Sequence, residues 1–158
     1  MKRVNQILNH EVFKQSMEAI KEYEVARIFC GHDIEHLLSV ARIMTISALE
    51  NNMDINKEII YATALLHDIG RSVQYSGGVH HCVAGPKLAT EILEDVDFSE
   101  EEKSMIINAV GNHNNESKQD RLSELLKYAD NASRNCFNCT AYDECNWNYE
   151  RKNHEISI

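Results

Sequence analysis

The sequence contains few of the residues that interrupt helices. One proline and 6 glycines occur in 158 residues. Because proline and glycine mark most tight turns, their scarcity argues against a sandwich of many short strands. Leucine, isoleucine, alanine, glutamate and lysine are well represented instead. We therefore expect an all-α fold, a single compact helical bundle with a short cysteine-bearing tail at its C-terminus.

Basic residues are also scarce. Lys and Arg number 16 against 25 Asp and Glu, so the net charge is -9. Binding to a nucleic-acid polymer needs a basic surface, and we expect no such partner. A single nucleotide that reaches a local metal pocket stays compatible with this charge.

Long apolar runs are missing from the sequence. No segment approaches the ~20 apolar residues of a membrane span, and the first residues carry no signal core. We expect a cytoplasmic protein with no membrane partner, and its oligomeric state stays open. The 5 cysteines are an odd number, which in a reducing compartment indicates free thiols or metal ligands rather than a disulfide framework.

Apolar residues at helical spacing predict six helices in one domain. Asp33 is a candidate cap for the second of them, and Ser99 with Glu102 forms a capping box before the fifth. The irregular stretch after Gly70 is expected to be a loop at the rim of a cleft, and Pro86 is expected in the first turn of the helix that follows it. The helices are predicted at 6–28, 33–49, 56–67, from about 86, 99–113 and 122–130. We divide the domain into an N-terminal helical part (1–29), a metal-binding core (30–135) and a cysteine-rich segment (136–158).

An apolar helix ends in the adjacent pair His67 and Asp68. Burying an imidazole and a carboxylate costs free energy unless they are hydrogen-bonded, ion-paired or bound to a cation. Taken alone, the pair is better explained if Asp68 simply orients His67 near a helix end. Further candidate ligands beside apolar helical patterns favour a metal site, namely His36, His81, His113 and Asp130. His32, one turn before His36, is the rival for the first ligand, and we prefer His36 because the apolar run starts directly after it.

These candidates offer nitrogen and oxygen donors and no thiolate. Such a set suits Mn, Fe, Co, Ni, Zn or Mg, and cannot choose among them. A bridging carboxylate with several imidazoles could hold two ions about 3.5–4 Å apart and activate water against a phosphoryl group. Asp68 is the natural bridge between two such ions.

The order of these motifs resembles the HD-domain metal-dependent phosphohydrolase superfamily, of the HDIG type. His36, the His67-Asp68 doublet followed by Ile-Gly, and Asp130 follow its His, His-Asp, Asp pattern over roughly residues 30–135. The segment from His81 to Gly85 is similar to the His-x-x-x-Gly element of members with extra histidine ligands.

The resemblance implies hydrolysis of a phosphate ester or anhydride by one or two divalent ions. It assigns His36, His67, Asp68 and Asp130 to the primary site, with His81 and His113 at a second ion. Either of these last two could instead be a substrate-binding base in a one-metal site. Asp68, His67 and Arg71 are the expected catalytic residues. Arg71 is expected to contact phosphate, and a solvated surface arginine is nearly as good an explanation for it.

Three cysteines follow the last candidate ligand closely: Cys136, Cys139 and Cys145. A zinc or iron–sulfur site needs a fourth ligand, for which Cys30, Cys82 or His154 are the candidates. A redox-active pair or small buried side chains are the alternatives, and reduced structural thiols are slightly preferred.

The first functional hypothesis is a hydrolase that acts on a small phosphate compound, with a nucleotide as the favoured substrate. The alternative is a metal- or nucleotide-sensing module without turnover, coupled to the cysteine tail. Oxygen activation at a di-iron site in the same scaffold is a third hypothesis, and we favour it less.

Overall fold

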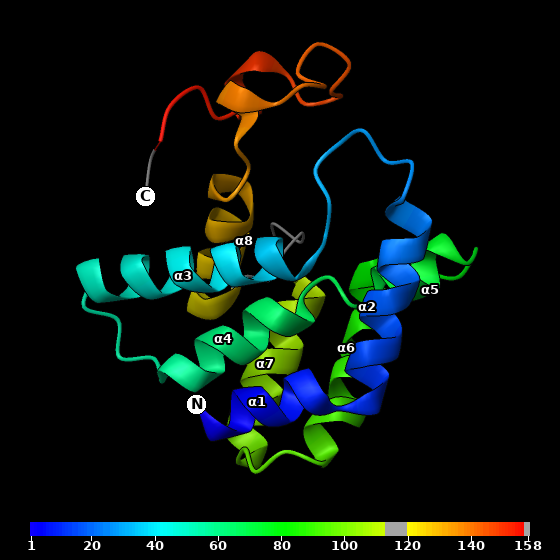
Figure 1. The fold of residues 1–158 in the computed structure, drawn as a ribbon. Helices are drawn as coiled ribbons and strands as arrows, with labels where there is room; N and C mark the ends of the chain where they lie inside the picture. The colour runs from blue at the N-terminus through cyan, green and yellow to red at the C-terminus, as the bar shows by residue number, and fades with distance from the viewer. Residues whose placement is uncertain (113–119, 157–158) are drawn as a thin grey trace.

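The computed structural model describes residues 1–112 and 120–156, and its regular elements there are all helical. The prediction of an all-α fold is confirmed. Figure 1 shows helices packed at several angles around a central one, with the C-terminal segment on one side. The elements are α1 (Lys2–Asn9), α2 (Glu11–Glu24), α3 (Ile34–Glu50), α4 (Lys57–Leu66), α5 (Arg71–Tyr75), α6 (His81–Glu94), α7 (Glu100–Asn112), α8 (Arg121–Ala132) and the 3-10 turns η1 (Cys136–Asn138) and η2 (Tyr149–Arg151).

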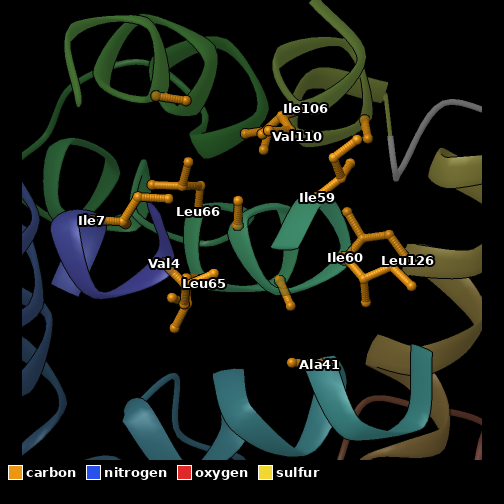
Figure 2. Close-up of a cluster of buried hydrophobic side chains, with 14 of the residues drawn as sticks. Val4, Ile7, Ala41, Ile59, Ile60, Leu65, Leu66, Ile106, Val110 and Leu126 are labelled. Carbon is orange, nitrogen blue, oxygen red and sulfur yellow. The ribbon is translucent and has the colours of Figure 1, made fainter. Parts of the chain in front are cut away.

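Helix α4 is the centre of the hydrophobic core. Its residues are buried almost throughout, as expected for a helix that is apolar on every side. Figure 2 shows its side chains facing α1, α3, α7 and α8, where Ala41, Ile106 and Leu126 contribute to the same cluster. Each fully buried Leu or Ile contributes about 1.5–3 kcal/mol relative to an exposed one. The His67-Asp68 pair follows directly at the C-terminal end of this helix.

The N-terminal segment is two helices rather than the single helix predicted at 6–28. His10 separates them with an extended backbone (φ -66°, ψ 136°), and its Nδ1 accepts a hydrogen bond from the backbone N–H of Val12 at 3.2 Å. The spacing of apolar residues does not reveal a helix boundary of this kind, because the boundary depends on the capping hydrogen bond of the His10 side chain.

Two further expectations about the region after Gly70 are wrong. The stretch predicted as a loop contains the short helix α5, and α6 already begins at His81, so Pro86 lies inside that helix rather than in its first turn. Gly111 on α7 leaves room for the proline ring, because a Cβ at Gly111 would lie 3.1 Å from Pro86 Cγ.

The two predicted helix caps are confirmed. The Asp33 carboxylate accepts a hydrogen bond from the backbone N–H of His36 at 2.9 Å. Ser99 and Glu102 form a reciprocal capping box, with Ser99 N–H donating to Glu102 Oε2 at 2.9 Å and Glu102 N–H donating to Ser99 Oγ at 3.2 Å. The Asp33 cap fixes the start of the helix that carries His36.

None of the described helices combines the length and the apolar character that a membrane crossing requires. The division of the chain at residues 29 and 135 stays a prediction.

Candidate metal centre

Four of the predicted ligands meet where three helices end. His36 lies in the first turn of α3, His67 and Asp68 follow α4, and Asp130 lies in the last turn of α8. Each offers a ligand atom, and these atoms lie within 4.8 Å of one another. The site forms because α3 and α8 both pack on the buried helix α4, with the ligand-bearing ends on the same side.

One carboxylate oxygen, Asp68 Oδ2, is at the centre of the cluster. Three imidazole Nε2 atoms surround it, those of His67 at 3.1 Å, His36 at 3.7 Å and His32 at 3.9 Å. The oxygen is buried and has no hydrogen bond of good geometry among the described residues. Burying a carboxylate oxygen in this way is costly unless a cation compensates. A divalent ion between this oxygen and the imidazoles would remove that cost.

The imidazoles present the nitrogen that a metal needs. His67 Nδ1 lies 2.7 Å from the backbone carbonyl of Ala64, so Nδ1 carries a proton and, in the neutral ring that binds a metal, Nε2 carries the lone pair. His36 Nδ1 lies 3.2 Å from Ser133 Oγ, whose own hydrogen is donated to the Asp130 carbonyl at 2.7 Å. We therefore assign the same tautomer to His36. Metal-binding histidines are commonly fixed in this way by a partner on the other ring nitrogen.

His32 belongs to the same site, although the sequence favoured His36 over it as the first ligand. Its side chain is buried, and its Nδ1 is hydrogen-bonded to Glu24 Oε1. Tyr75 donates a second hydrogen bond to that oxygen at 2.6 Å. Burial raises the pKa of Glu24, but the bonds from His32 and Tyr75 outweigh burial and bring the pKa to about 2. Both histidines face Asp68, and His36 is the one whose ligand atom clusters with those of His67, Asp68 and Asp130.

The second oxygen of Asp68 faces a different set of groups. Arg71 Nε donates a hydrogen bond to Oδ1 at 2.7 Å, and His81 Nε2 lies 3.8 Å from it. His81 Nδ1 lies 2.8 Å from Gln74 Oε1, and the Nε2 that faces Asp68 also lies 3.4 Å from Cys82 Sγ. The two oxygens of Asp68 therefore point to separate groups of candidate ligands, as a bridging carboxylate would require. The other residue predicted for a second ion, His113, lies outside the described residues.

The charges of the site are strongly coupled. Burial raises the pKa of Asp68, but His67, His36 and Arg71 together hold it well below its ordinary value. Burial lowers the pKa of His67, and the Asp68 carboxylate outweighs this, so the pKa of His67 is raised. Asp68 is therefore ionised at neutral pH and available to a cation.

Arg134 is a member of the site that the sequence reasoning missed. Its Nη2 donates to Asp130 Oδ1 at 3.0 Å and lies 3.0 Å from His36 Nε2, and its Nη1 donates to the Gly31 carbonyl at 3.0 Å. Arg134 Nη2 thus occupies a position between His36 Nε2 and Asp130 Oδ1, where a metal ion bound by both residues would lie. Arg134 follows Asp130 by four residues, just beyond the end of α8, and this spacing was the signal that could have revealed it.

Comparison with known proteins agrees with this geometry. A family model described as HD domain matches residues 33–135. The chain belongs to the HD-domain family. That match includes the four clustered ligands and Arg134.

Relatives of this HD domain differ in how much they share with it. An uncharacterized protein of Clostridium beijerinckii is 40% identical over 156 residues, which is 99% of each chain. Ribonuclease Y of Mycoplasma mycoides is 29% identical over 101 residues, covering 63% of this chain but 18% of its own length. A predicted HD superfamily hydrolase from an uncultured Thermotogales bacterium has the same fold, with a TM-score of 0.62 and 24% identity over 77% of this chain and 66% of its own.

Gly70 allows the HD domain to hold its second group of ligands close to Asp68. A Cβ on Gly70 would lie 2.4 Å from the His81 carbonyl oxygen and 2.5 Å from the Gly85 backbone nitrogen. Backbone therefore contacts backbone where α6 passes the end of α4. At Gly85, the glycine of the predicted His-x-x-x-Gly element, a Cβ would meet Val110 Cγ1 at 3.1 Å but Gly70 N only at an ordinary 3.9 Å, so the close approach to the end of α4 depends on Gly70.

Proposed function

We propose that this HD domain binds one or two divalent ions around Asp68 and hydrolyses a phosphate ester or anhydride bond of a small substrate. The observation that carries the proposal is the buried Asp68 Oδ2, which has three imidazole Nε2 atoms within 3.9 Å and no hydrogen bond of good geometry among the described residues. The family membership supports the same conclusion.

The first ion would be held by His36, His67, Asp68 and Asp130, and His81 with His113 would serve a second. A divalent ion there would polarise a phosphoryl oxygen and make water a better nucleophile near neutral pH. Mn, Fe, Co, Ni, Zn and Mg all suit the donors. Arg71 has two tasks in this scheme: it keeps Asp68 ionised through its hydrogen bond to Oδ1, and its guanidinium, which also interacts with Tyr75, lines the cavity in which a phosphate oxygen would bind.

The cavity beside the site supports a phosphate substrate. It has a volume of about 500 Å³ and includes Asp130 in its wall. Although the whole chain carries a net charge of -9, five cationic side chains line this cavity, those of Arg27, Arg71, Arg134, Arg151 and Lys152. Arginine in particular matches the geometry of phosphate oxygens. Phe29 and Trp147 line the same cavity, and aromatic rings of this kind support a nucleotide as the substrate.

We further propose a small molecule rather than an RNA chain as the substrate, and a cytoplasmic location. The net charge disfavours a polymeric partner. The chain spans about a fifth of the length of the ribonuclease Y relatives, so their name alone does not assign RNA as the substrate.

Phosphate release tests this proposal. Wild-type protein is screened against phosphomonoesters, phosphodiesters, nucleotides and a short RNA with added Mn, Co, Ni or Mg. We expect metal-dependent turnover that falls at least 100-fold in the D68N and D130N variants. The matched control is D95N, an exposed carboxylate paired with His10 outside this site, which is expected to keep full activity.

Two outcomes would contradict the proposal. Turnover that is equal in D68N and D95N would place the reaction elsewhere. Metal binding without turnover on any substrate would favour the sensing module instead.

A further inference from the structure

The fold brings a fourth cysteine to the three cysteines of the tail. Cys30 lies in the connection between α2 and α3, more than a hundred residues before Cys136, yet the two line, together with Cys139 and Cys145, the same cavity of about 500 Å³ that Asp130 and Arg71 line. Figure 1 shows this connection and the C-terminal segment at the same end of the molecule. Of the three candidates for a fourth ligand, Cys82 and His154 are not among the described residues that line the cavity. The fold therefore selects Cys30.

The local backbone is suited to presenting two of these thiols. Cys136 and Cys139 are the first residue of the 3-10 turn η1 and the residue that follows it, and Cys139 N–H donates to the Cys136 carbonyl at 3.2 Å. A Cys-x-x-Cys pair on a tight turn is the usual spacing of two ligands in a zinc or iron–sulfur site.

The thiols also influence one another electrostatically. Burial raises the pKa of Cys30, the Arg134 cation opposes this, and the Cys139 and Cys136 thiols raise it further. The Arg134 guanidinium would compensate part of the negative charge that several thiolates bring together. All 5 cysteines of the chain are free, so no disulfide accounts for this convergence.

The tail has almost no hydrophobic core to hold it in place. Among described residues 135–156, only Cys136 and Ala141 are buried, whereas Phe137, Tyr149 and Ile156 are exposed. Its regular structure is limited to two 3-10 turns. Segments with so little apolar burial commonly depend on disulfides or a metal for their order.

We propose that Cys30, Cys136, Cys139 and Cys145 bind a metal centre through four thiolates in the wall of this cavity, and that the centre shares no ligand with the HD site. The spacing of the sulfurs favours an iron–sulfur cluster over a single zinc ion. Four thiolates around one zinc ion lie about 3.8 Å apart, given Zn–S bonds of about 2.3 Å. Among the described residues, no three cysteine sulfurs lie within 4.8 Å of one another. A cluster of several irons holds its thiolates farther apart than one ion does.

The first test measures iron, acid-labile sulfide and zinc in the full-length protein purified without oxygen or chelator. We expect iron and sulfide in equal amounts, with visible absorption that bleaches on reduction. The C30S variant should lose at least nine-tenths of the sulfide and of the visible absorption, and C136S should do the same. C82S is the matched control and should keep the centre, as should D68N, which disrupts only the HD site. Zinc lost from C30S and C136S but kept in C82S and D68N would support the four-thiolate site with a single ion in it.

Metal lost from C136S but kept in C30S would overturn the assignment of Cys30. Absence of sulfide and of any thiolate-bound metal in the wild type would overturn the site itself. If C30S fails to fold, X-ray absorption on wild-type protein decides, because the proposal requires sulfur-only ligation by four thiolates or by thiolates and bridging sulfides.

Discussion

Replacing Gly70 by alanine tests whether the close approach of two backbone segments builds the second side of the site. Gly70 has φ -63° and ψ -13°, a conformation that alanine adopts readily. Replacing a glycine by alanine at such a position should by itself stabilise the protein by about 0.4–1 kcal/mol, because alanine lowers the conformational entropy of the unfolded chain. The new Cβ, however, would lie 2.4 Å from the His81 carbonyl oxygen and 2.9 Å from Gly85 Cα. Both are backbone atoms, so no side chain can rotate away, and overpacking of this kind costs about 3 kcal/mol.

The net expectation for G70A is therefore a loss of about 2 kcal/mol, which lowers the Tm of a chain of this length by roughly 4–8 °C. The measurement is thermal and urea unfolding followed by circular dichroism. G31A is the matched control, because a Cβ there meets only Glu24 Oε2 at an ordinary 3.6 Å and should change the Tm by less than about 2 °C. An unchanged or higher Tm for G70A would refute the close packing of α6 against the end of α4.

Two further substitutions test the charges of the structure. R134M should bind Mn²⁺ about tenfold more tightly in calorimetric titrations, because the guanidinium no longer occupies His36 Nε2 and Asp130 Oδ1, and such charge-assisted bonds contribute about 1.5–3 kcal/mol. Weaker binding would show that Arg134 supports the ion. E58Q should destabilise the protein by about 1 kcal/mol at pH 7, because Glu58 accepts a hydrogen bond from Arg3 Nε at 2.7 Å. That bond lowers the pKa of Glu58 below its ordinary 4.5. The difference in stability from wild type should therefore be full above pH 4.5 and decline as the pH falls through the lower folded pKa. A difference that does not decline below pH 4.5 would contradict this.

Sequence patterns were sufficient for those features that depend on local spacing. The apolar run of α4 predicted a buried helix that ends at His67, and the Ser99 and Asp33 caps marked helix starts that the structure confirms. The grouping of four ligands followed from their places beside apolar faces, since those faces must all turn to one core.

Features that depend on contacts between distant segments could not be predicted in this way. Glu24 and Tyr75 hold His32 from two other elements, and Cys30 joins the tail only through the path of the chain between α2 and α3. Pro86 within α6 is tolerated because Gly111, on a neighbouring helix, leaves room for its ring. In each case the contact joins residues that are far apart in the sequence, and hydrophobic periodicity describes only residues that are close together in the sequence.

The most direct test of the account is a crystal structure of the protein with Mn²⁺, examined by anomalous scattering at the manganese edge. The account predicts an anomalous peak bounded by His36, His67, Asp68 and Asp130, with the Arg134 guanidinium displaced from His36 Nε2. A crystal that contains Mn²⁺ at other positions but gives no peak beside Asp68 would contradict the metal site and the hydrolytic function built on it.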